Sequence, residues 1–145
     1  MKIYTNSITN AVFTILSSWE PFVNSGTLIE QFREYNTDPN KTPWIGVYSP
    51  FIVFDLYRAN IISPFMATYN IPIISQVAIF RDIEEGAQLL AELSGEIYTA
   101  VSCYRNLLNT VEIIKGITID PYNRYIEEED NLFADRITII AEVFA

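Results

Sequence analysis

The sequence predicts an α+β fold in which a long helix packs on one face of a mixed or antiparallel sheet of four to five strands. An amphipathic N-terminal helix pattern opens the chain, strand patterns follow in its middle and at its end, and the longest helical pattern lies between them. Because strands stand before and after one long helix, we expect that helix to cover one sheet face. The length of 145 residues fits a single domain spanning 1–145.

The first element is predicted to be an amphipathic helix. Its apolar residues recur at helical spacing; they are Ile8, Ala11, Val12, Ile15, Leu16 and Trp19. Pro21 should end or kink this helix, because the residue before a proline is pushed out of the helical region. A short second helix is expected from the spacing of Leu28, Ile29, Phe32 and Tyr35.

Strands are expected in the middle of the chain. Pro43 opens the segment 43–48, and proline is tolerated at the first position of a strand. After Ser49-Pro50, the segment 51–57 either continues this strand or packs separately. The segment 71–81 has apolar residues on both alternating faces, which predicts a central strand covered on two sides.

The second half holds the long helix and a closing pair of strands. The helix is expected from Ile83 to about Asn109, where apolar residues follow a near-heptad spacing. The segment 113–119 contains Gly116, which marks a candidate bulge. The last strand, 136–144, alternates two sets of side chains on its two faces.

One stretch between the strands is open to two interpretations. Residues 58–70 contain Pro64 and are apolar for a loop, so they form either a partly buried connection or an arm that packs on a neighbouring subunit. Aromatic residues make up 14% of the chain, which favours subunit association. The candidate contact residues are Ile61, Ile62, Phe65 and Met66.

Composition argues against several classes of function. Eighteen Asp and Glu against nine Lys and Arg give a net charge of −9, which disfavours binding to nucleic acid or an anionic membrane. The absence of His removes the commonest general base and metal ligand. The one cysteine, Cys103, is interpreted as a small core residue rather than a nucleophile. We therefore expect no enzyme activity, no catalytic residue, no cofactor and no metal site.

Membrane and secretion patterns are also missing from the sequence. No apolar run is long enough for a membrane span. The start, Met1–Asn6, lacks the apolar region of a secretory signal, so we expect an intracellular protein without a membrane partner.

The acidic residues gather in the second half of the chain. Residues 1–72 hold five acids and four bases (net −1), whereas residues 73–145 hold thirteen acids and five bases (net −8). This asymmetry serves either solubility or a wall that repels a passing polyanion. The densest cluster, Glu127, Glu128, Glu129 and Asp130, is a solvated loop, a surface for a basic partner or, on a third interpretation, a cation site.

The order of these patterns resembles that of the tail terminator (tail completion) proteins of tailed bacteriophages. The resemblance covers nearly the whole chain. It is carried by the helix over Ile8–Trp19, by Pro43, Ile45 and Val47 of a Pro-x-Ile-x-Val strand, by the strand 71–81 and the long helix, and by the closing segments 116–122 and 136–141.

The resemblance implies a structural virion protein without catalytic residues, located in the tail or neck and assembled in the host cytoplasm. Such proteins form a hexameric ring on the end of the tail tube, stop tube polymerisation and offer a surface to the head-side connector. The acidic second half, with Glu127, Glu128, Glu129 and Asp130, would then line a lumen through which DNA passes without being specifically bound. The alternatives are a head-closure, connector or baseplate protein of a phage, and a small adaptor domain outside phages.

Overall fold

Three helices and six strands make up the part of the chain that the computed structural model describes, which comprises residues 5–31, 41–54, 66–78, 83–121 and 132–144. Along the chain the elements are α1 (Thr5–Ser18), α2 (Glu20–Ser25), β1 (Leu28–Gln31), β2 (Trp44–Val47), β3 (Phe51–Phe54), β4 (Met66–Ala78), α3 (Ile83–Ser102), β5 (Ile113–Pro121) and β6 (Leu132–Phe144). The strands form one sheet in the order β1-β2-β4-β6-β5, and β3 pairs with β4 beside this path.

The long antiparallel pair of β4 and β6 forms the centre of the sheet. Each strand has 13 residues, and the two pair over their whole length. β5 adds antiparallel to the other side of β6, whereas β1 pairs with β2 in parallel. The sheet is therefore mixed, and the predicted α+β class is confirmed. It has six strands instead of four to five, because β1 was expected to be helical.

β2 and β3 lie one after the other along the same edge of β4. β2 pairs with Ile73–Gln76, and β3 pairs with Ala67–Asn70. Ser49-Pro50 separates the two strands. Just before it, the N–H of Tyr48 donates a hydrogen bond to the carbonyl oxygen of Pro72 in β4 (3.1 Å). Proline is tolerated in this central strand because its missing N–H falls where the neighbouring strand is interrupted.

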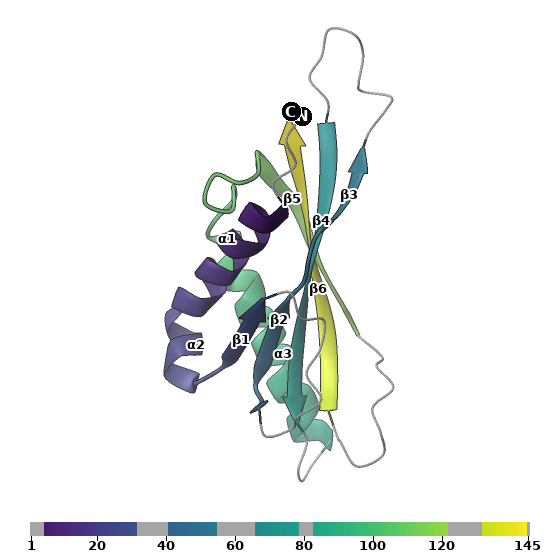
Figure 1. Cartoon of the computed structure of the whole chain (residues 1–145). Coiled ribbons are helices and arrows are strands. Elements are labelled where there is room, and N and C mark those ends of the chain that lie inside the picture. The colour runs from purple at the N-terminus through teal and green to yellow at the C-terminus, as the bar shows by residue number, and fades with distance from the viewer. Residues whose placement is uncertain (1–4, 32–40, 55–65, 79–82, 122–131, 145) are drawn as a thin grey trace, which may run out of the picture.

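All three helices lie on one side of the sheet, and no described helix covers the other side (Figure 1). Alternate residues of β4 face the helices and are buried. The prediction that the segment 71–81 is covered on two sides is wrong at its start, since Pro72 on the other face is partly exposed, and it holds where Ile74 and Gln76 are buried. The core between the layers is built from Ala67, Tyr69, Ile71, Ile73 and Val77 of β4, Ile8, Ala11, Val12, Ile15 and Leu16 of α1, Leu93, Ile97, Ala100 and Val101 of α3, and Ile137, Ile139 and Ala141 of β6. None of the described helices is long and apolar enough to cross a membrane.

The region after α1 departs from the prediction. Pro21 ends α1 as expected, but it also stands in the first turn of a six-residue helix, α2. Gly26, with φ of +69°, ends α2 in the left-handed conformation, and the chain then enters the sheet as β1. Pairing with β2 outweighs the helical spacing of the apolar residues here, because a short apolar run fits either period.

The long helix ends earlier than predicted. α3 stops at Ser102, and Leu107, Leu108 and Asn109 have φ values of +46°, +56° and +66°. An α-helix of L-residues is right-handed, so it cannot contain this left-handed segment. Cys103, predicted to be a core residue, is exposed just after the helix.

Two strand boundaries also differ from the prediction. β4 begins at Met66, so the last five residues of the stretch 58–70 are strand rather than a connection or arm. β5 continues to Pro121, two residues beyond the segment 113–119 expected from the sequence. The bulge expected at Gly116 is confirmed, because the register with β6 shifts between Ile114 and Gly116.

Candidate functional site

The sheet face opposite the helices, called the open face below, has a polar centre. The cross-strand register defines which side chains share this face. Its central residues are Thr68, Asn70 and Pro72 of β4, Thr138 and Ile140 of β6, and Thr118 of β5. All of them are partly or fully exposed. Polar side chains along one face of an antiparallel sheet are typical of contact with water.

One end of the open face is closed. Trp44, Ile74 and Ala134 form a small buried cluster there, separate from the main core. The indole N–H of Trp44 donates a hydrogen bond to Oε2 of Glu30 (3.0 Å) on the neighbouring strand β1. Since the buried indole has its partner, Trp44 acts as a packing residue.

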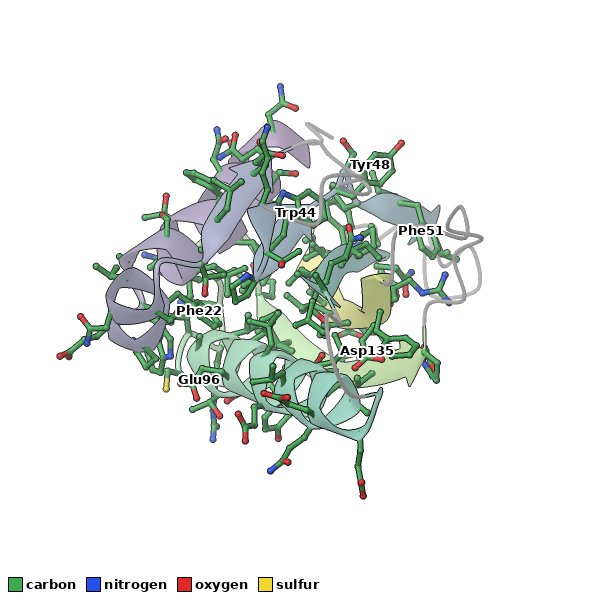
Figure 2. The ribbon with its side chains drawn as sticks, turned by 90° about the horizontal axis from the view of Figure 1, so that it is seen from below. Phe22, Trp44, Tyr48, Phe51, Glu96 and Asp135 are labelled. Atoms are coloured by element: carbon green, nitrogen blue, oxygen red, sulfur yellow. The ribbon has the colours of Figure 1, made fainter. Side chains whose placement is uncertain are left out.

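Most of the exposed apolar side chains in the described part of the sheet lie on two of its edge strands, β3 and β5; the others are Leu28 of β1 and Phe133 of β6. On β3, Phe51 is 58% exposed and Val53 is 53% exposed, and both lie on the open face. On β5, Ile113 is 47% exposed and Ile119 is 44% exposed. Figure 2 shows Phe51 on the side of the molecule remote from the helices. Exposed apolar edges of this kind are sites where further strands add.

β5 carries two features that interrupt regular pairing along its outer edge. At the bulge, the ammonium group of Lys115 forms an ion pair with the carboxylate of Glu142, whose side chain is largely buried. At its end, Pro121 has no N–H to donate. Bulges, lysines and prolines protect sheet edges in natural proteins. The regular part of this edge is therefore limited to Gly116–Asp120.

A polar cluster joins α3 to the helix-facing side of the sheet. The hydroxyl of Ser94 donates to Oδ2 of Asp135 (2.9 Å), so the hydroxyl of Ser75, 2.8 Å from that of Ser94, is the donor in their contact. Figure 2 shows Asp135 beside α3. Burial raises the pKa of the Asp135 carboxyl above its ordinary value, and the Ser94 hydrogen bond offsets part of this rise.

The outer surface of α3 is acidic. The helix contains four glutamates and no lysine or arginine. Glu85, Leu89 and Glu92 lie along one exposed stripe, because residues four and three apart share a helix face. Glu96 is tied inward, where its Oε1 accepts a hydrogen bond from the indole N–H of Trp19 (2.6 Å).

The residues predicted as interface or lumen are mostly not placed by the structure. Ile61, Ile62, Phe65 and the acidic run Glu127, Glu128, Glu129 and Asp130 lie outside the described residues. Met66 opens β4 and is paired in register with Phe144. Among the described residues no group of three potential metal-ligating His, Cys, Asp or Glu side chains occurs.

The sequence analysis missed the exposed apolar residues of β3. A signal was present, since Phe51–Phe54 is an uninterrupted apolar run that follows a proline. Such a run alone does not distinguish a buried strand from an exposed edge, because both are apolar.

The fold of this chain is similar to that of a solved virion structure. A chain of the "Virion of native gene transfer agent (GTA) particle" superposes with a TM-score of 0.55 at 9% sequence identity, covering 99% of this chain and 100% of that chain. No protein-family model and no curated protein matches the sequence. At this identity the likeness establishes a shared fold.

Proposed function

We propose that this protein is a structural component of a virion, which forms a ring that caps the tail tube, ends tube polymerisation and joins the tail to the head-side connector. The observation that carries the proposal is the full-length fold likeness to a virion chain. The order of elements, which resembles that of tail terminator proteins, supports the finer assignment. The two observations are independent, since one rests on sequence pattern and the other on the superposed backbone.

The proposed ring is a homo-hexamer made by head-to-tail contacts. Such heterologous contacts generate a closed ring when the rotation between neighbours closes. Ile61, Ile62, Phe65 and Met66 remain proposed contact residues. The proposed lumen would be lined by the acidic surface that includes Glu127, Glu128, Glu129 and Asp130, past which DNA travels without specific binding. The role is structural and requires neither a cofactor nor catalysis.

The proposal is tested by adding the purified protein to tail tubes assembled from the tube protein of the same virus. Light scattering gives the mass of the protein alone, and electron microscopy gives the lengths and ends of the tubes. We expect shorter tubes that carry a ring at one end, and a mass that is either hexameric or monomeric until tubes are added.

A parallel experiment with purified head-side connector distinguishes the alternative. Binding to the connector with no effect on tube length or tube ends would contradict the terminator function and favour a head-closure or connector protein. A monomer or dimer that binds neither the tail tubes nor the connector would contradict a role in the neck.

A further inference from the structure

The distribution of exposed apolar residues separates two ways in which another molecule could meet the sheet. A partner docked flat on the open face would cover its polar centre, where Asn70, Thr118 and Thr138 contact water. Burying such groups without hydrogen-bonding partners is costly. Pairing at the edge strands β3 and β5 instead covers their exposed side chains and leaves the polar centre of the open face in contact with water.

The two edges match each other in chemistry. β3 has four residues, and it places the large side chains of Phe51 and Val53 on the open face. On the same face of β5, between the bulge and Asp120, stand only Gly116 and Thr118. A Cβ added at Gly116 would meet none of the described residues within 4 Å, so nothing in that part of the chain fills the space beside it. An aromatic residue on an adjacent strand covers an edge glycine of this kind.

The helix-facing side of the two edges matches as well. Ile119 of β5 lies on this side and is 44% exposed, although its neighbour Ile117 packs against the core. Ile52 of β3 lies on the same side and also packs against the core. Placing β3 of one copy beside β5 of another therefore sets apolar residues next to each other on this side.

The orientation of the strands suits a ring. Through β4 and β6, each antiparallel to its neighbour, β3 runs antiparallel to β5 within one copy. A second copy rotated about an axis along the strands would present its β3 antiparallel to β5. The two segments are offset along the sheet, since β3 lies opposite Ala67–Asn70 and Gly116–Ile119 lies level with Asn70–Ile73. A sheet closed into a ring requires such a stagger.

We propose that β3 of one copy pairs with the Gly116–Ile119 segment of β5 of the next copy, so that the sheets of neighbouring subunits are continuous. This inference rests on the ring of the proposed function and adds a strand-pairing contact to the contact residues proposed there. Pairing of two copies through α3 is less favourable. The exposed glutamates of one α3 would repel those of the other, and the helix contains no lysine or arginine to offset them.

A single edge contact is too small to hold two copies together, so each copy needs a neighbour at both of its edges. A stable protein interface buries about 800 Å² per partner. Even a whole aromatic side chain buries only about 150–250 Å², so the exposed parts of Phe51, Val53 and Ile119 fall short of that area. One edge contact is thus weak, whereas a closed ring gives each copy two such contacts.

Cysteine crosslinking tests the pairing. In a Cys103→Ser background, Val53→Cys and Thr118→Cys are made singly and together, and each protein is treated with a short bismaleimide with and without tail tubes. Both positions are on the open face, and neither is buried. We expect the double variant to give a ladder of multimers up to the ring, and each single variant to give no crosslinked species.

The outcomes separate this inference from the proposed function. Rings on tube ends with no ladder in the double variant would overturn the edge pairing and leave the terminator function standing. Crosslinked dimers of the Val53→Cys single variant would contradict the edge pairing, because they would show that β3 of one copy lies beside β3 of another. A ladder without any effect on tubes would support the edge pairing and contradict the terminator function.

A charge placed on the edge gives a second, independent measurement. Phe51→Lys should abolish the ring, because a lysine on an edge strand opposes strand addition. The matched control is Leu89→Lys, an equally drastic change at a 46% exposed residue of α3. Rings formed by Phe51→Lys, or an equal loss of rings in both variants, would contradict the assignment.

Discussion

The two faces of β4 belong to the same 13 residues, yet they have opposite environments. Tyr69, Ile71 and Ile73 point to the helices and are fully buried, whereas Thr68, Asn70 and Pro72 alternate with them and remain partly exposed. The difference comes from the period of two in a strand, which assigns successive side chains to opposite faces. The fold is therefore stabilised mainly from the helix side of the sheet, and the centre of the other side stays accessible to water.

The largest loss of stability is expected from a substitution on the buried face of β4. Ile71→Ala should lower the free energy of unfolding by about 2–5 kcal/mol, because it removes a fully buried side chain and leaves a cavity. The matched change at the next residue, Asn70→Ala, should alter it by no more than about 0.5 kcal/mol. Urea denaturation measures both, and equal effects would contradict the assignment of the two faces.

A smaller effect is expected at the polar link between α3 and the sheet. Ser94→Ala should cost about 1–3 kcal/mol, because the hydroxyl of Ser75 and the carboxylate of Asp135 lose their shared partner. Ser102→Ala on the same helix is the control, since its hydroxyl is exposed. A cost at Ser102 that matches the cost at Ser94 would show that the link adds nothing beyond helix propensity.

At the β5 edge, Lys115→Met should cost no more than about 1 kcal/mol. The ion pair with Glu142 is lost, but the lysine side chain is 46% exposed and its charge is screened by water. The cost should shrink further in concentrated salt. Arg105→Met, at an exposed residue, serves as the control, and a salt-independent cost would indicate lost packing rather than lost charge.

The smallest effect concerns the pH dependence of Asp135. Burial raises the pKa of its carboxyl in the folded protein, so folding favours the protonated form. The resulting stability is present below the pKa of the unfolded chain and is lost as the pH rises through the folded-state pKa. Asp135→Asn should therefore be more stable than the parent at neutral pH, with the gain fading as the pH falls through the folded-state pKa of Asp135 and absent below the pKa of the unfolded chain, about 3.9. Denaturation across pH measures this, and a gain unchanged in acid would contradict it.

Long periodic segments were predicted well from the sequence. The helical stripe of α1 and the alternation along β6 both lie where expected, because each repeats its period often enough to exclude the other. The bulge at Gly116 was also predicted, since a glycine inside a strand seldom has another role.

Short segments and segment ends were predicted less well. β1 is a strand of four residues where a helix is predicted. Four residues are too few to distinguish the helical from the strand periodicity of apolar side chains. The predicted end of α3 is too late, since the apolar spacing continues through Leu108, which is exposed and lies beyond the end of the helix. Cys103 was assigned to the core on its apolar neighbours, but the helix ends before it and leaves it exposed.

From the sequence alone, the α+β class, the buried stripe of α1 and the alternation that divides β6 into two faces are predictable. These features follow from local periods of side chains, which need no knowledge of distant partners. The sequence does not reveal that β1 joins β2 in parallel, that Ser75, Ser94 and Asp135 meet, or that Phe51 and Val53 lie on a strand that pairs only with β4 within the described part of the chain. Each depends on pairing between segments far apart in the chain, and local pattern does not encode which strand becomes the neighbour of which.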